Sequence, residues 1–156
     1  MKKFFSNLII GILRIFKKTP EDLISLSARL GVGIVFWQCA QSRITGWYFM
    51  GEFWQFFNLR QGAFSEFRAY HLPFLPAELA AYLATIGTFF FSLFLFIGFA
   101  TRFSALGLFI ITLVIQFFVS PANWQIHLLW SSALLYILKY GPGVISLDHF
   151  FYRKWA

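Results

Sequence analysis

The sequence is poor in cysteine, in charged residues and in histidine. Cys39 is the single cysteine, so the chain can form no internal disulfide, no CxxC redox pair and no four-cysteine metal cluster. Any redox chemistry would therefore need the cofactor of another molecule. The 3 histidines, His71, His127 and His149, stand in separate parts of the chain, and they predict no three-histidine metal site.

Charged residues make up only 12% of the chain, about half the usual share of a soluble domain. In contrast, 59% of the residues are hydrophobic and 22% are aromatic. A soluble domain of 156 residues could not bury 23 phenylalanines, so the composition predicts one membrane domain. The net charge of +7 would also suit nucleic-acid binding, but the basic residues lie beside apolar spans. We therefore exclude nucleic acid and expect the lipid bilayer as partner.

The longest apolar run extends from Ala77 to Ala100 and contains one charged residue, Glu78. It exceeds the roughly 20 residues that a helix needs to cross ~30 Å of hydrocarbon. Pro76 favours a helix start, because proline fits the first turn of a helix but not its interior. The run therefore predicts a membrane span at about 77–100.

Three further apolar stretches are separated by turn signals such as Pro20, Pro121 and the Gly-Pro-Gly sequence at 141–143. They predict spans at about 23–41, 103–119 and 124–140. The predicted fold class is an all-α integral membrane protein, a four-helix transmembrane bundle over residues 23–151.

Residues 1–18 have the pattern of an interfacial amphipathic helix, with an apolar stripe opposite basic residues. A signal peptide is the alternative, but Arg14 interrupts the apolar core and no small-residue cleavage site follows Lys18. Residues 43–71 mix aromatic residues with glycines, which predicts an aromatic outer loop at the headgroup level. The aromatic residues of this loop are Trp47, Tyr48, Phe49, Phe53, Trp54, Phe56 and Phe57.

Basic residues are distributed unequally between the two sides of the predicted bundle. Most lie in the N-terminal segment, in the short turn at Arg102 or near the C-terminus, whereas the other side has only Arg43, Arg60 and Arg68. By the positive-inside rule, this predicts that both termini are cytoplasmic and that the protein lies in a bacterial inner membrane.

Polar residues recur on one helical face of each predicted span, which places them toward the bundle rather than toward lipid. There they either hold helices together or line a polar cavity. We assign a structural role to Arg29, Glu78, Arg102 and Asp148. We assign a ligand-binding role to Trp37, Gln41, Gln116, Trp124, His127 and Trp130.

The predicted cavity opens toward the outer face, where Gln41, Gln116 and His127 fall at similar depth. Polar groups left unpaired in hydrocarbon are costly, so these must meet one another, water or a ligand. A quinone would suit the site, with an amide or imidazole on its carbonyl and a tryptophan against its ring. Mutual hydrogen bonding is the simpler alternative, and an interfacial histidine bonded to a backbone carbonyl is another for His127.

Several blocks of sequence together resemble the DoxX family of small four-span bacterial inner-membrane proteins. They are RLGVGIVFW in the first span, HLPFLPAELAAYLAT before and in the second, GFATRFSALGL across the short turn, WQIHLLW in the fourth and the closing GPGVISLDHF. Within that family the chain looks most similar to members encoded beside bufferin-type metal-stress peptides. The resemblance implies a four-helix bundle associated with redox or stress systems, since some relatives are membrane subunits of a thiosulfate:quinone oxidoreductase.

The chain also departs from the pattern of that family. Thr88 stands where relatives often carry a glutamate, and Ser92 where they carry a proline. The usual glycine and lysine after the first span are Ala40 and Arg43 here. A function that depends on an intramembrane carboxylate is weakened by these changes.

Three functions are compatible with the sequence. The first is an accessory membrane subunit of a redox or maturation system, with no intrinsic cofactor and with a quinone as candidate ligand. The second is a component of copper or oxidative stress defence that binds or moves a small ligand. The third is a structural anchor without ligand. We expect a non-catalytic component and name no catalytic residue. The sequence is compatible with a redox or metal-handling partner protein and with a homo-oligomer.

Overall fold

The computed structural model describes residues 20–45, 58–70 and 75–155, and within these ranges the chain has six α-helices and no β-strand. The helices are α2 (Glu21–Arg43), α3 (Gln61–Ala69), α4 (Ala77–Ile97), α5 (Thr101–Val114), α6 (Trp124–Tyr140) and α7 (Leu147–Trp155). A π-helical turn, Ile115–Val119, continues α5, and a 3-10 turn, Pro121–Asn123, leads into α6. The predicted all-helical class is confirmed. The predicted N-terminal helix at 1–18, the aromatic residues of 47–57 and His71 lie outside the described residues.

Three of the described helices are long and apolar enough to cross a membrane. They are Glu21–Arg43, Ala77–Ile97 and the continuous helix Thr101–Val119. Each overlaps one of the ranges expected to span, and many large apolar side chains on their outer faces are exposed, such as Ile34, Leu79 and Leu106. The protein is therefore an integral membrane protein with three candidate spans.

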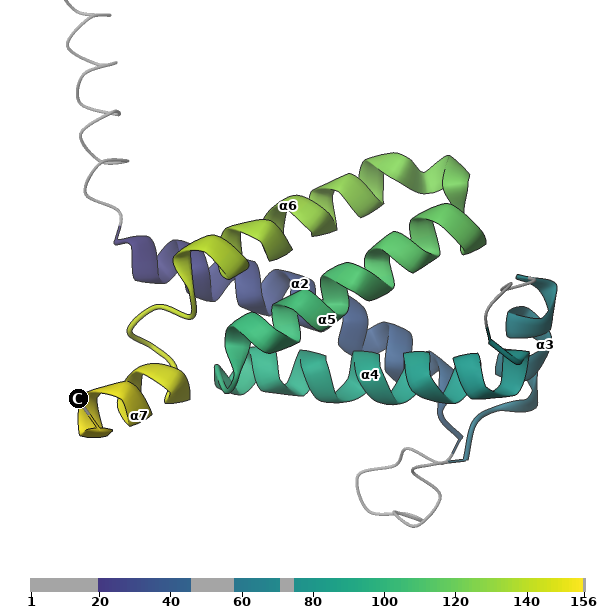
Figure 1. Ribbon diagram of the computed structural model, residues 1–156, viewed down its shortest axis with the longest axis horizontal. Helices are drawn as coiled ribbons and strands as arrows, with labels where there is room; N and C mark the ends of the chain where they lie inside the picture. Colours follow the sequence, from purple (N-terminus) through teal and green to yellow (C-terminus); the bar gives the residue numbers. More distant parts are fainter. Residues whose placement is uncertain (1–19, 46–57, 71–74, 156) are drawn as a thin grey trace, which may run out of the picture.

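The four long helices run alternately up and down (Figure 1). α2 packs against α4 and α6, and α5 packs against the same two helices, so the bundle closes on itself. α7 lies at the end of the bundle where α2 and α5 begin, which we call the α7 end. α3 packs against α4 at the opposite end, which we call the α3 end. The end of α4 and the start of α5 lie close together at the α7 end, and the two helices separate toward the α3 end.

The short turn between α4 and α5 depends on a glycine. Gly98 ends α4 with φ of 73°, a left-handed conformation that glycine adopts without strain, and its N–H donates to Phe94 at 2.8 Å. A Cβ at this position would also clash with the Arg29 guanidinium and with Ser146. Gly98 therefore allows α2, α4 and the segment before α7 to meet.

Asp148 connects α7 to the start of α5. Its carboxylate accepts hydrogen bonds from the backbone N–H groups of Ala100 at 2.7 Å and Thr101 at 2.8 Å. These are unsatisfied donors at the N-terminus of α5, where the helix dipole also favours a negative charge. Asp148 therefore caps a helix that is remote from it in the sequence.

Arg29 lies in the same region and is 1% exposed. Its Nη2 donates to the carbonyl of Ile145 at 2.5 Å, and the nearby Asp148 carboxylate carries the opposite charge. Ser25, one turn earlier on α2, donates to the carbonyl of Gly141 at 2.8 Å. The polar residues of α2 thus hold the segment between α6 and α7 against the bundle.

The other two residues assigned a structural role lie nearer the surface. Glu78 forms an exposed ion pair with Arg68 of α3 at 3.0 Å, so it does not face the bundle core as the stripe on α4 predicted. It lies in the first turn of α4, where the neighbouring helix is the short α3. Arg102 is exposed, and its guanidinium lies beside Gly141.

Candidate functional site

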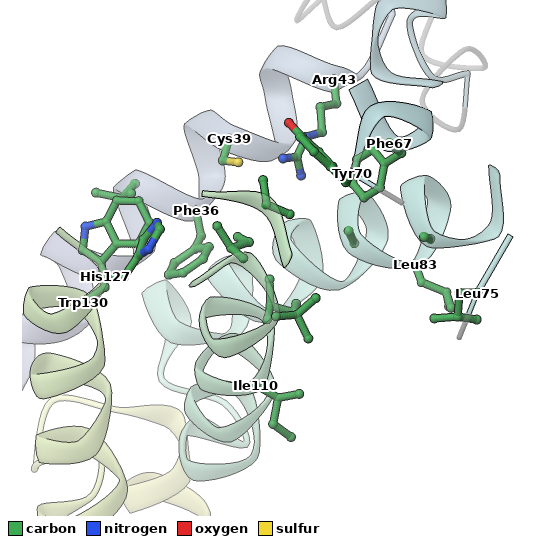
Figure 2. Close-up of a pocket in the computed structure, with 17 residues that line it drawn as sticks. Phe36, Cys39, Arg43, Phe67, Tyr70, Leu75, Leu83, Ile110, His127 and Trp130 are labelled. Carbon is green, nitrogen blue, oxygen red and sulfur yellow. The ribbon is translucent and has the colours of Figure 1, made fainter. Parts of the chain in front are cut away.

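A cavity of about 320 Å³ lies between the long helices toward the α3 end. Figure 2 shows residues of α2, α3, α4, α5 and α6 around it, in the space where α4 and α5 separate. Most of its wall is apolar, formed by side chains such as Phe36, Leu83 and Ile110. Its size is at the lower end of the range of ~300–1,000 Å³ that is typical of small-molecule sites.

Aromatic rings form one side of this cavity. Phe36 of α2 contacts Trp130 of α6 edge to face, with ring centroids 5.5 Å apart. Trp130 in turn lies 5.3 Å from the imidazole of His127, one turn earlier on α6. Such a wall suits a flat ring, because aromatic pairs prefer offset or edge-to-face contact.

His127 is the most deeply buried polar group of the cavity, at 6% exposure. Its Nδ1 lies 2.6 Å from Oε1 of Gln116, and Nε2 of Gln116 donates to the carbonyl of Pro121 at 3.0 Å. Among the described residues the imidazole has no further hydrogen-bond partner. The edge of the ring that carries Nε2 is therefore available to a ligand.

The π-helical turn positions Gln116 for this contact. A π-turn inserts one extra residue into the helix, and here the N–H of Ser120 bonds to the carbonyl of Ile115, five residues earlier, at 2.9 Å. The side chains that follow Ile115 are rotated relative to a continuous α-helix. Gln116 consequently faces α6 and the Pro121 turn.

A second polar group lies at the α3 end of the cavity, formed by Arg43, Tyr70 and Cys39. The guanidinium of Arg43 lies 5.1 Å above the ring of Phe67, a cation–π contact, and Figure 2 shows it next to the ring of Tyr70. Burial raises the pKa of the Tyr70 phenol above its usual value, the Glu66 carboxylate raises it further, and Arg43 opposes this shift. Tyr70 is therefore a neutral hydroxyl beside a cation at neutral pH.

The structure brings together only part of the predicted ligand-binding set. His127 and Trp130 line the cavity, and Gln116 supports His127 from behind. Trp37 lies outside this lining and packs on Phe89 and Phe96 of α4, with ring centroids 4.7 and 6.0 Å away.

Two further predicted residues also lie outside the lining of the cavity. Gln41 is half-buried one turn beyond Trp37, on the same face of α2. Trp124 is 56% exposed. Trp37, Gln41 and Trp124 therefore do not share a site with His127 in this structure.

Sequence reasoning missed the polar group at the α3 end. In the sequence, Cys39 stands out only as the single cysteine and Arg43 only as a marker of orientation, and Tyr70 does not stand out. The signal lay in the spacing of Val35, Cys39 and Arg43, which recur every fourth residue and share one face of α2.

The described part of the chain contains no group of three or more histidine, cysteine, aspartate or glutamate residues that could hold a metal ion. A second hollow, of about 720 Å³, lies at the α7 end and is lined by polar residues that include Arg102, Asp148 and His149. Asp148 is already engaged in capping α5, so this hollow has a structural explanation.

A family model described as DoxX matches residues 24–121 of the chain, well over half of its length. The match extends from the first turn of α2 to Pro121, and it therefore includes Cys39, Arg43, Tyr70 and Gln116. His127 and Trp130 follow it. No curated protein and no solved structure matches the chain.

Proposed function

This chain belongs to the DoxX family, and on that premise we propose that it is an accessory membrane subunit that holds a small apolar ligand for a redox or maturation system. The observation that supports the proposal is the cavity between the helices. It has an apolar, partly aromatic wall and two separate polar groups, one at His127 and one at Arg43 and Tyr70. Nothing in this arrangement requires the protein to catalyse a reaction by itself.

A quinone is the ligand class that best fits such a wall. Its ring can lie against Phe36 and Trp130, and its two oxygens need hydrogen-bonding groups on opposite sides. Figure 2 shows His127 and the Arg43–Tyr70 pair on different sides of the cavity. Ligand sites of this kind combine a large apolar surface with a few polar groups that fix orientation.

The proposed topology has four spans and cytoplasmic termini. α6 is 17 residues long, or roughly 25 Å, a little less than the ~30 Å of hydrocarbon. Its ends at Trp124 and Tyr140 carry aromatic rings of the kind that anchor helices at interfaces. It packs along both α2 and α5, so we expect it to cross the membrane beside them. The α3 end then faces outward, where a periplasmic or membrane partner could reach the cavity.

Copper or oxidative stress defence is the second candidate function. It is favoured by the presence of one thiol, Cys39, and one imidazole, His127, in the wall of the same cavity. These are donors that suit copper. The resemblance to members encoded beside bufferin-type peptides points to the same function. A structural anchor is the third candidate and corresponds to an empty cavity.

Cys39 provides a direct test because it is the single cysteine and lines the cavity. We would reconstitute the chain in lipid nanodiscs and measure the rate at which N-ethylmaleimide labels Cys39, with and without duroquinone. Duroquinone is chosen because its ring is fully methylated and does not readily add thiols. We expect a saturable, severalfold decrease in the labelling rate.

The matched control moves the thiol out of the cavity. In the double variant Cys39→Ser, Ser42→Cys, the thiol lies on an exposed position of the same helix that does not line the cavity. Its labelling rate should not depend on duroquinone. If neither duroquinone nor durohydroquinone changes the labelling of Cys39 in the native chain, the proposed function is wrong; protection by Cu(I) alone would favour the second candidate.

A further inference from the structure

The hydrogen-bond chain behind His127 determines which chemical group the imidazole offers to the cavity. The carbonyl of Pro121 can only accept, so the Gln116 atom 3.0 Å from it is the donor Nε2. The other amide atom, Oε1, therefore faces Nδ1 of His127 at 2.6 Å. Because Oε1 can only accept, Nδ1 carries the proton.

A neutral imidazole has one N–H, so protonation at Nδ1 leaves Nε2 as an acceptor. The opposite tautomer would place two acceptors face to face at the contact of His127 with Gln116. Rotation of the Gln116 amide would relieve that contact but would place Oε1 against the carbonyl of Pro121. The first arrangement leaves a repulsive contact at the imidazole of His127, which is 6% exposed, and the second loses the exposed hydrogen bond from Gln116 to Pro121, so the tautomer protonated at Nδ1 is favoured.

We propose that the cavity prefers the hydroxyl-bearing form of its ligand, a hydroquinone or another phenol, over the carbonyl-bearing quinone. The hydroxyl donates its hydrogen to Nε2 of His127. This inference rests on the proposed function, since it assumes that an aromatic ligand with ring oxygens enters the cavity. A quinone carbonyl in the same place would meet a second acceptor and leave both unpaired.

The other polar group of the cavity does not cancel this preference. A hydroxyl can donate and accept, whereas a carbonyl can only accept. Arg43 supplies donors, and the Tyr70 hydroxyl can donate or accept, so both forms of the ligand can be satisfied at that side. Discrimination therefore depends on His127. A buried, unpaired polar group corresponds to roughly tenfold or more in affinity.

Such a preference has a consequence for any partner that exchanges electrons with the ligand. Stabilising the reduced form raises the midpoint potential of the bound couple above that of the free couple. For a two-electron couple, a tenfold preference corresponds to about 30 mV. The ligand would thus be held as a reduced, proton-bearing molecule and be released more readily after oxidation.

The test compares durohydroquinone with duroquinone in the Cys39 labelling assay. The hydroquinone is reduced beforehand, freed of reductant and kept under anaerobic conditions. The measurement is made at pH 8, where an unperturbed imidazole is mostly neutral. We expect half-maximal protection at a concentration of durohydroquinone at least tenfold lower than that of duroquinone.

Two variants separate this preference from a merely structural role of the histidine. In His127→Asn, the side-chain amide can still donate to Gln116, but the acceptor at Nε2 is lost. The ratio of the two half-protection concentrations should fall toward one. In Gln116→Glu, the exposed hydrogen bond to Pro121 is lost, and a carboxylate opposite Nδ1 favours the imidazolium, whose Nε2 donates, so the ratio should shift toward the quinone.

The outcomes are distinguishable. Protection by both forms with equal affinity, or with the quinone bound more tightly, would overturn the inference and leave the proposed function intact. A native ratio that persists in His127→Asn would overturn it as well. If neither form protects Cys39, the proposed function fails and the inference fails with it.

Discussion

Replacing Asp148 by alanine tests how the α7 end of the bundle is held together. Asp148 accepts hydrogen bonds from the backbone N–H groups of Ala100 and Thr101, at 2.7 and 2.8 Å. Both donors belong to the start of α5, which has no other side-chain cap among the described residues. The carboxylate is also the negative charge near the buried Arg29. The alanine variant therefore removes two hydrogen bonds and a counter-charge.

The expected cost follows from these contacts. A hydrogen bond to a charged group contributes about 1.5–3 kcal/mol. Asp148 is only half-buried, so water replaces part of what the two N–H groups lose. Loss of a charge near a helix N-terminus adds about 0.3–1 kcal/mol. We therefore expect Asp148→Ala to lower the free energy of unfolding by about 3 kcal/mol.

The assay is reversible unfolding in mixed detergent micelles, followed by the far-UV circular dichroism signal. Asp22→Ala is the matched comparison, because Asp22 accepts a single hydrogen bond, from the exposed N–H of Val144 at 2.7 Å. It should lower the free energy of unfolding by about 1 kcal/mol. An Asp148→Ala variant that is no less stable than Asp22→Ala would refute this account of the α7 end.

Three other predictions follow from the structure. Gly98→Ala should destabilise the fold by about 2 kcal/mol or more in the same assay, because alanine resists a φ of 73° and its Cβ would clash with the side chains that face it. Because the pKa of the Tyr70 phenol is raised in the folded chain, the unfolded chain loses the phenol proton at lower pH than the folded chain does. The free energy of unfolding should therefore fall as the pH rises above about 10, and this fall should be smaller in Tyr70→Phe. A topology reporter fused after Ala156 should be active in the cytoplasm, whereas one inserted at Gly62 should be active only outside it. Deletion of residues 1–18 should leave both results unchanged. An external C-terminus would contradict the four-span topology.

The long helices were predictable because membrane spans leave a simple signal in the sequence. Apolar stretches of at least 17 residues, separated by turn signals, marked four ranges that overlap α2, α4, α5 and α6. The burial of Arg29 followed from the cost of a charge against lipid. These arguments need only composition and helical period, which do not depend on neighbours.

The site was less predictable because it depends on which helices become neighbours. Trp37 and Cys39 lie on different faces of α2, and only the packing of α2 between α4 and α6 decides that Cys39 lines the cavity. Trp124 and Trp130 have equivalent spacing from His127, but Trp130 packs on Phe36 of α2, whereas Trp124 is 56% exposed. The predicted convergence of Gln116 and His127 is present, although its geometry depends on the π-turn at 115–119, for which the sequence has no clear signal.

Retention of a ligand in the cavity tests the central claim most directly. We would extract the chain with its surrounding lipid in polymer-bounded nanodiscs and quantify the quinone that it carries, oxidised and reduced forms together, by mass spectrometry. Ala84→Phe fills the cavity from α4, and Leu79→Phe adds the same ring at a position on α4 that is 47% exposed and outside the lining. The account predicts enrichment of quinone over the bulk membrane in the native chain and in Leu79→Phe, and its loss in Ala84→Phe. Equal quinone content in a folded Ala84→Phe variant and in the native chain would contradict it.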